Sequence, residues 1–268
     1  MPRLVHLIAD YGAGDLAFAE VVQRLGPAVP DAVVHPTPVG AFDTLSAGFV
    51  IAQLALTDGS PDRIVVHNVA PRQDQRGPRP ANEGERFCAG RTRDGVLVIG
   101  PNAGWSWSFC ASQLQSLHYL DMPSSGSQFR SRDFLPAAVG DLAAGQRHAL
   151  RDPVPPGHIA PLPENAVAYV DGYGNVKTTI DTSPADSGAR VLVRVGEVSA
   201  TAIVTDGTFA VAEGELALAA GSSGWTAHEG TRRRFFELFL RGGSAAQRFA
   251  HPASGTPIHL EPAEPGSR

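Results

Sequence analysis

The sequence has few of the features that would assign a protein at once to a functional class. Cys88 and Cys110 are the only cysteines in 268 residues, too few for a disulfide framework and without the CxxC spacing of a zinc site. No two histidines stand at HxxxH or HxH spacing, and neither GxGxxG nor GxxxxGK[ST] occurs. These absences disfavour a disulfide scaffold, a metal site and pyrophosphate binding. We expect free thiols in a reducing compartment.

Long apolar runs and strong charge are also missing. No stretch approaches the ~18 uninterrupted apolar residues of a membrane-spanning helix. The formal net charge is only −5 and the arginines are scattered, which argues against a nucleic-acid or anionic-membrane surface. We therefore expect no nucleic-acid and no membrane partner, a cytoplasmic protein and a small-molecule ligand.

The residues that are present indicate a turn-rich globular protein of two domains. The chain has 29 glycines, 22 prolines and 43% hydrophobic residues. In residues 1–153 short apolar runs alternate with helical patterns, the former at 4–9, 32–35, 63–69 and 95–101 and the latter at 15–26, 42–56 and 132–145. This alternation predicts an α/β N-terminal domain with a largely parallel sheet, whose ligands bind at the carboxyl ends of the strands.

The composition changes after residue 153. Residues 154–163 are proline-rich and cannot continue a helix or a central strand, so they are predicted to be a linker. Short β-type runs divided by Gly, Asp and Ser fill residues 164–252 and predict a smaller antiparallel β-domain. Residues 253–268 are rich in Pro, Glu and Ser and are predicted to be a flexible tail.

Polar residues gather in the turns that follow the predicted strands. Asp10 ends a strand in "IADYGAGD", and Asp15 precedes the next helical pattern. A carboxylate at a strand end can accept two hydrogen bonds from a ribose diol, whereas an Asp before a helix is commonly its N-cap. Asn102 follows another strand, and Asp171 and Asn175 stand in a similar turn of the second domain. Each turn alone is equally explained by the backbone tolerance of Asn and Gly.

Two further stretches carry candidate chemistry. "RIVVHNVAPR" ends an apolar run with His67 and Asn68, either a catalytic group or a polar stop at the end of a strand. "SQFRSRDF" places Arg130 and Ser131 just before a helical pattern, where Ser131 or Asp133 could simply cap the helix.

Taken together and in order, these turns resemble the motifs of the S-adenosylmethionine hydroxide adenosyltransferase family, which also contains the fluorinase and chlorinase enzymes. The family pattern reads TDFG…D, VVDPGVGT…R, PDNG or PNNG, FHGRD or FYSRE, D…FGN, and NSRG or GSSG. This chain reads "ADYGAGD", "VVHNVAPR", "GPNAGW", "FRSRD", "DGYGN" and "GSSGW". Any one motif is weak, but the whole set in register is specific.

The resemblance implies a fold, an assembly and a reaction. It implies an N-terminal α/β domain, a C-terminal β-barrel-like domain, and a homotrimer whose ligand lies between one subunit's N-terminal domain and its neighbour's C-terminal domain. The family breaks the C5′–sulfonium bond of S-adenosylmethionine with water or an anion and releases methionine and a 5′-substituted adenosine. S-adenosylmethionine is then a substrate, and no separate cofactor is expected.

Carried over by position, the resemblance implies a set of substrate-binding residues. Asp10 holds the ribose hydroxyls, Asp15 faces the methionine amino group, and Phe42 stacks near the ribose. Asn175 and Ser222 read the adenine. We add the adjoining turn residues to the predicted substrate-binding set, namely Asn68, Asn102, Asp171 and Ser223.

The chain departs from the family at the catalytic positions. His67 stands where the family has the Asp of VVDPG, and Arg130 stands where it has the His of FHGRD. The family arginine that follows the central loop has no certain counterpart, because strict spacing gives Asp74 while Arg72 and Arg76 lie on either side.

Three interpretations of the predicted catalytic set, His67, Arg130 and Ser131, remain open. In the first, a neutral His67 is the general base for water and Arg130 supplies positive charge. In the second, Arg130 and Ser131 bind a halide, although Ala70 replaces the hydroxyl residue that fluorinase has in the other loop. In the third, the chain binds S-adenosylmethionine or adenosine without turnover, and His67 is a hydrogen-bonded polar residue.

Overall fold

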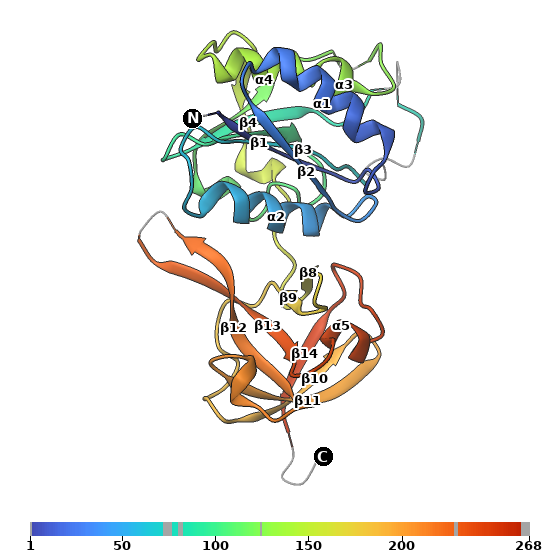
Figure 1. The fold of residues 1–268 in the computed structure, drawn as a ribbon, viewed down its shortest axis with the longest axis vertical. Helices are drawn as coiled ribbons and strands as arrows, with labels where there is room; N and C mark the ends of the chain where they lie inside the picture. Colours follow the sequence, from blue (N-terminus) through green and yellow to red (C-terminus); the bar gives the residue numbers. More distant parts are fainter. Residues whose placement is uncertain (1, 72–76, 80–82, 124, 228–229, 264–268) are drawn as a thin grey trace. The chain divides into compact units, whose positions relative to one another are not determined.

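The computed structural model describes residues 2–71, 77–79, 83–123, 125–227 and 230–263. The chain divides into two compact units, residues 1–161 and residues 162–268 (Figure 1). Each unit contains one mixed sheet of seven strands.

The first unit is built on a sheet with the strand order β2-β1-β3-β5-β4-β6-β7. The strands β2, β1, β3 and β5 pair in parallel, whereas β5, β4, β6 and β7 pair antiparallel. The strands are β1 (Leu4–Ala9), β2 (Val33–Pro38), β3 (Ile64–Asn68), β4 (Phe87–Thr92), β5 (Leu97–Pro101), β6 (Leu114–Leu120) and β7 (Leu150–Pro153). The expected parallel part is therefore present. The sheet is nevertheless mixed rather than largely parallel, because β4, β6 and β7, which the sequence pattern did not predict, pair antiparallel.

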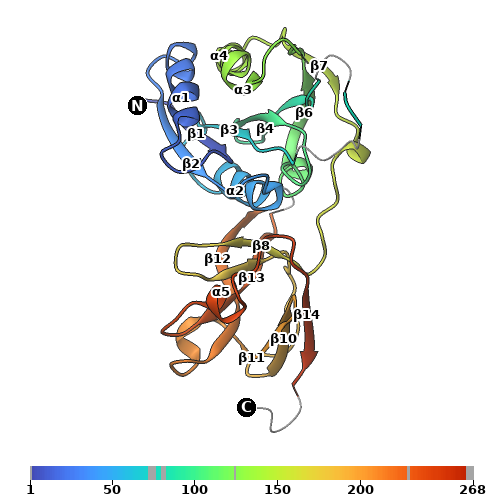
Figure 2. The same ribbon diagram turned by 90° about the vertical axis from the view of Figure 1, so that its right-hand side faces the viewer.

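Helices cover both faces of this sheet. The helices α1 (Leu16–Ala28), α3 (Arg130–Asp133) and α4 (Leu135–Ala143) lie on one face, and α2 (Thr44–Leu56) lies on the other (Figures 1 and 2). Apolar residues of α1 and α4 pack on inward-facing positions of β1, β3 and β5 in one buried cluster that includes Val21, Val139, Leu7, Val66 and Ile99. Short crossover helices on a parallel β1-β3-β5 core explain why both faces of these strands are apolar.

Arg63 holds the end of α2 in place. Its guanidinium donates hydrogen bonds to the carbonyl oxygens of Leu54 (2.8 Å), Ala55 (3.0 Å), Ser60 (2.8 Å) and Thr57. The last carbonyls of a helix have no partner within the helix and carry its partial negative charge. Arg63, just before β3, therefore ties the C-terminus of α2 to the start of a central strand.

The second unit has the strand order β14-β10-β11-β12-β13-β9-β8. Only β11 and β12 pair in parallel, and the other neighbours are antiparallel. An antiparallel bridge between Ala166 and Pro257 links the chain beside the two edge strands. The elements are β8 (Val167–Val170), β9 (Val176–Thr178), β10 (Arg190–Val195), β11 (Val198–Thr205), β12 (Leu216–Thr226), β13 (Arg232–Leu240), α5 (Ala245–Arg248) and β14 (Ile258–Pro262).

The C-terminal stretch corrects the prediction of a flexible tail. Residues 258–262 form β14, which pairs with β10 along its length, and Ile258 is buried. The pattern of alternate apolar residues in "IHL" was hidden by the prolines on either side. The prediction of a flexible tail is thus wrong for residues 258–262. Residues 264–268 lie outside the described part of the chain.

We predict that Arg63→Met destabilises the first unit by about 2–4 kcal/mol, because several buried or partly buried carbonyls at the end of α2 lose their donor at once. Chemical denaturation followed by circular dichroism measures the change. Arg147→Met, which replaces an exposed arginine of the same unit, is the matched control and is expected to change stability by less than about 0.5 kcal/mol. Equal stability of the two variants would contradict this role for Arg63.

Candidate functional site

The carboxyl ends of the parallel strands of the first unit open into a cleft of about 410 Å³. Asp10 directly follows β1, Asn68 ends β3 and Pro101 ends β5, and all of them line the cleft. The parallel register pairs Ala9 with Asn68, so these strand ends lie side by side. The cleft therefore lies where ligands bind in parallel α/β sheets.

The remaining walls come from α3 and from the chain that leads into β4. Phe129, Arg130 and Ser131 contribute one wall, and Arg79, Glu83, Glu85 and Phe87 contribute another. β4 enters beside the end of β5, where Phe87 pairs with Pro101. The structure thus brings together four of the predicted site residues, namely Asp10, Asn68, Arg130 and Ser131.

Tyr11 connects two of these walls and was not among the predicted residues. Its hydroxyl accepts a hydrogen bond from Asn68 Nδ2 at 3.0 Å and lies 3.0 Å from Ser131 Oγ. The ring packs edge-on against Phe18 and Phe129, with centroid distances of 5.0 and 5.6 Å. The turn "ADYG" contained the residue, but its partners lie 57 and 120 positions away in the chain, so no local pattern indicated the network.

Arg130 provides positive charge in the cleft. Its Nη2 donates to the backbone oxygen of Glu85 at 3.0 Å, and the guanidinium stands 5.1 Å from the centroid of the Phe87 ring. Burial lowers the pKa of Arg130, and Arg79 lowers it further, against the opposing effect of Glu85. Arg79 itself pairs with Glu85 at 3.5 Å. Among the described residues no carboxylate forms an ion pair with Arg130, although Glu85 acts on its charge from nearby.

His67 does not line the cleft. Successive side chains of a strand point to opposite faces, and His67 lies on the face opposite Asn68, with none of its surface exposed. Its ring packs against Trp107 at 5.2 Å and fills the space over Gly100, where a Cβ atom would lie 2.4 Å from the imidazole. Burial lowers the pKa of His67 to about 3.

The surroundings of His67 correct the interpretation in which it is a hydrogen-bonded polar residue. Neither ring nitrogen has a hydrogen-bond partner in the described part of the chain. Trp107, which packs against the imidazole, is itself fully buried and donates Nε1–H to Pro101 O at 3.0 Å. The two rings therefore belong to the interior of the first unit.

Asp15 and Phe42 lie outside the cleft lining. Asp15 is the N-cap of α1, where its Oδ1 accepts from the Ala17 N–H at 2.8 Å. Phe42 has a positive φ of 61° and an exposed fraction of 46%. Its backbone N–H donates to Asp10 Oδ2 at 3.0 Å, so Asp10 holds this strained residue beside the end of β1.

Asn102 serves the chain that leaves the first unit rather than the cleft. Its Nδ2 donates to His158 O at 2.9 Å, Trp105 Nε1 donates to Pro161 O at 3.0 Å, and Ser108 Oγ donates to Ala160 O at 2.6 Å. Three polar side chains of the "PNAGWSWS" turn thus donate hydrogen bonds to the backbone of residues 158–161. We call these three contacts the linker clamp.

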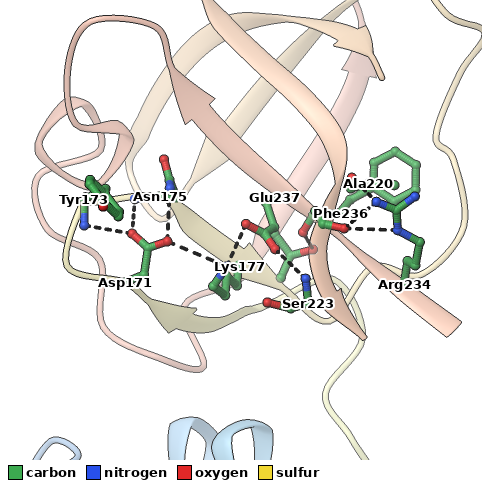
Figure 3. A network of polar contacts seen from close by, with 11 residues as sticks. Asp171, Tyr173, Asn175, Lys177, Ala220, Ser223, Arg234, Phe236 and Glu237 are labelled. Atoms are coloured by element: carbon green, nitrogen blue, oxygen red, sulfur yellow. Dashed lines mark hydrogen bonds and ion pairs between the residues drawn. The ribbon is translucent and has the colours of Figure 1, made fainter. Parts of the chain in front are cut away.

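Three of the predicted residues of the second unit, Asp171, Asn175 and Ser223, belong to one polar network (Figure 3). Asp171 accepts from the backbone N–H groups of Tyr173 and Asn175 and from Asn175 Nδ2, at 2.9, 3.0 and 3.0 Å. Lys177 Nζ lies 3.7 Å from Asp171 Oδ2 and donates to Glu237 Oε2 at 2.8 Å. Ser222 is exposed, whereas Ser223 is buried.

Lys177 and Glu237 form a buried ion pair that the sequence analysis did not anticipate. Glu237 is only 1% exposed and also accepts from the Ser223 N–H at 3.5 Å. Gly221 makes room for this carboxylate, because a Cβ atom there would lie 1.8 Å from Glu237 Oε1. A charged pair is tolerated in this interior because each partner neutralises the other.

Arg72, Asp74 and Arg76, the candidates for the family arginine, lie outside the described residues.

Within the described ranges, no group of three or more His, Cys, Asp or Glu side chains could hold a metal ion. Over the same ranges, none of the helices has the length and apolar character needed to cross a membrane.

Comparison with known proteins finds solved structures of similar fold. No protein-family model matches the chain, and a search of curated proteins found no match. An uncharacterized conserved protein from Thermotoga maritima has a similar crystal structure, with a TM-score of 0.75 and 20% identity over 96% of this chain and 100% of that chain. A conserved hypothetical protein from Thermus thermophilus gives a TM-score of 0.67 and 24% identity over 97% of this chain and 100% of that chain. At these identities the likeness shows a shared fold and assigns no activity.

The burial of His67 makes stability depend on pH. Between pH about 3 and 6.5 the His67 imidazole is protonated in the unfolded chain but stays neutral in the folded one. Stability is therefore fully present above pH 6.5 and falls by up to about 1.4 kcal/mol per pH unit as the pH is lowered toward 3. We expect His67→Leu to remove part of this slope, whereas the exposed His148→Gln leaves it in place. Denaturation curves between pH 4 and 7 measure it, and an unchanged slope in His67→Leu would refute the assignment.

The ion pair of the second unit gives another prediction. Lys177→Met leaves Glu237 buried without its partner and is expected to cost about 3–5 kcal/mol. Lys177→Met combined with Glu237→Leu removes both charges and is expected to recover most of this loss. Arg190→Met breaks an exposed pair with Glu215 and is the control, at less than about 1 kcal/mol. The measurement is chemical denaturation, and a double variant as unstable as Lys177→Met contradicts the assignment.

Proposed function

We propose that the chain binds S-adenosylmethionine and catalyses attack of water or hydroxide at C5′, giving adenosine and L-methionine. One observation carries the proposal. Asp10, Asn68, Arg130 and Ser131 come from three separate motifs of the resemblance, and they line one cleft at the ends of the parallel strands. The fold comparison is compatible with this activity but does not test it.

The cleft supplies groups suited to this displacement. The oxygen of hydroxide forms a bond to C5′ as the C5′–S bond breaks, and the electron pair of that bond stays on sulfur, giving the neutral thioether of methionine. The anion and the sulfonium cancel charge in the transition state, so a site that fixes hydroxide in line accelerates the step. Arg130 supplies the positive charge for hydroxide, and the Ser131 hydroxyl supplies a hydrogen bond.

The proton of the water needs an acceptor other than His67. His67 lies outside the cleft lining, on the opposite face of the sheet, and burial lowers its pKa to about 3. The cleft contains the carboxylates Glu83 and Glu85 on the wall that also carries Arg79. We assign proton acceptance to this wall, which replaces the role first given to His67.

Binding without turnover is the second candidate function. The position of His67 outside the cleft favours it, because the only imidazole at a family catalytic position is withdrawn from the ligand. In this alternative the chain is an S-adenosylmethionine or adenosine sensor with the same binding residues.

The finer features of the resemblance belong to the same proposal. We propose that the second unit closes into a barrel-like form, which the bridge between Ala166 and Pro257 supports, and that the protein is a homotrimer. Sedimentation equilibrium measures the second point, and a monomer at micromolar concentration would remove it.

The deciding experiment incubates the purified chain with S-adenosylmethionine, with and without chloride, and follows products by chromatography and mass. Adenosine plus methionine is the expected result. 5′-Chloroadenosine would instead make Ser131 and Arg130 a halide site. Tight binding with no product in a long incubation would leave the sensor, and the absence of binding would end both candidates.

We predict that Asp10→Asn weakens S-adenosylmethionine binding at least tenfold, because the amide loses the charge that accepts two ribose hydroxyls. The asparagine oxygen still accepts from the Phe42 N–H, so the turn is kept. Asp94→Asn, in the turn that precedes β5 and therefore at the opposite end of that strand from the cleft, is the matched control and is expected to bind normally. Isothermal titration calorimetry measures both, and equal affinities would exclude Asp10 from the site.

A further inference from the structure

Tyr11 lies at the junction of three elements that build the cleft. It follows β1, its hydroxyl contacts Asn68 at the end of β3, and the same hydroxyl contacts Ser131 in α3, at 3.0 Å in each case. Ser131 is only 3% exposed, so its hydroxyl has little access to solvent water as a hydrogen-bond partner. The phenol oxygen is therefore the group that links the strand ends to the helix.

The ring of Tyr11 is fixed independently of these hydrogen bonds. Phe18 of α1 and Phe129 before α3 meet it edge-on, at interplanar angles of 75° and 86°. Edge-to-face packing of this kind favours one ring orientation. The hydroxyl is consequently held at a defined point in the cleft even when no ligand is bound.

The donor inventory fixes the direction of the hydrogen bond between Asn68 and Tyr11. The Asn68 Nδ2 amide can only donate, so it occupies an acceptor position of the phenol oxygen. Either oxygen can be the donor in the 3.0 Å contact between Tyr11 and Ser131. When the phenol donates to Ser131 Oγ, the proton of Ser131 is left to point elsewhere. This order runs from Asn68 through Tyr11 to Ser131 and ends in a hydroxyl donor.

Two of these residues are departures from the family pattern quoted above. The pattern has Phe where this chain has Tyr11, and Pro where it has Asn68. The hydroxyl and the amide that replace those apolar residues are bonded to each other. The contact makes the amide and the hydroxyl one hydrogen-bonded unit.

We propose that Tyr11 is a positioning residue of the reaction, and that its phenol orients the Ser131 hydroxyl toward the oxygen nucleophile beside Arg130. The inference rests on the proposed function. Tyr11 forms no bond to substrate in this scheme and takes no proton. Its role is to fix the hydrogen bond that holds hydroxide in line with the C5′–S bond.

The test compares Tyr11→Phe, Ser131→Ala and the double variant in the full-length chain. Tyr11→Phe keeps the ring and its contacts with Phe18 and Phe129, so the fold is expected to survive. Removing one preorganised donor typically costs about 10²–10³ in kcat. We expect kcat to fall 10- to 100-fold in Tyr11→Phe because the donor is misoriented rather than absent, with KM changed less than threefold.

The double variant and the binding measurements distinguish a positioning role of Tyr11 from a merely structural one. If Tyr11 acts through Ser131, the double variant is no slower than Ser131→Ala, because residues of one unit are non-additive. Tyr119→Phe, which removes another phenol hydroxyl of the first unit outside the cleft, is expected to keep the wild-type kcat. Affinity for S-adenosylhomocysteine, measured by calorimetry, is expected to stay within threefold of the wild type in every variant.

The outcomes separate the two proposals. Wild-type turnover with an unchanged kcat in Tyr11→Phe overturns the positioning role and leaves the proposed function standing. Losses that multiply in the double variant also overturn it, because Tyr11 and Ser131 would then act independently. No turnover by the wild-type protein ends the proposed function, and the role of Tyr11 falls with it.

Discussion

The parallel pairing of β1 with β3 and of β3 with β5 determines where the residues of the cleft lie. This pairing brings three strand ends to one edge of the sheet, and everything polar in the cleft is attached to one of those ends or to a segment packed beside them. β4 then runs the other way beside β5 and delivers its leading residues to the same edge. A single register thus assembles side chains that lie as far as 120 positions apart in the chain.

The same pairing separates His67 from Asn68. Adjacent residues on a strand cannot share a face, so only one of them can reach the cleft. Asn68 takes the cleft side and joins Tyr11, whereas His67 enters the interior between the sheet and Trp107. The interior position costs the imidazole both of its hydrogen bonds in the described structure and lowers its pKa, and Gly100 provides the space for the ring.

The sequence was sufficient where a residue's role depends on its neighbours in the chain. The apolar runs that became β1, β3 and β5 were found, as were the three longer helices, because each is a continuous pattern several residues long. β4, β6 and β7 were missed, since β4 contains glycine and arginine, most of β6 is only partly buried, and β7 is largely exposed. Four candidate residues converge in one cleft, whereas His67 and Asn102 do not line it. The placement of His67 depends on which face of β3 its side chain takes relative to the cleft. That of Asn102 depends on the backbone carbonyl of His158, 56 positions later in the chain.

The buried pair of the second unit restricts the order in which this region of the chain can change over evolution. Gly221 cannot acquire a side chain while Glu237 is present, because the two would occupy the same space. Glu237 cannot be lost while Lys177 remains, because the ammonium would then be left in the interior with a weaker partner, Asp171, at 3.7 Å. Replacing Lys177 alone would in turn leave Glu237 buried without its partner, so viable lineages must replace the two together, and only afterwards is position 221 free to vary. Three positions far apart in the sequence are in this way expected to be inherited as a set.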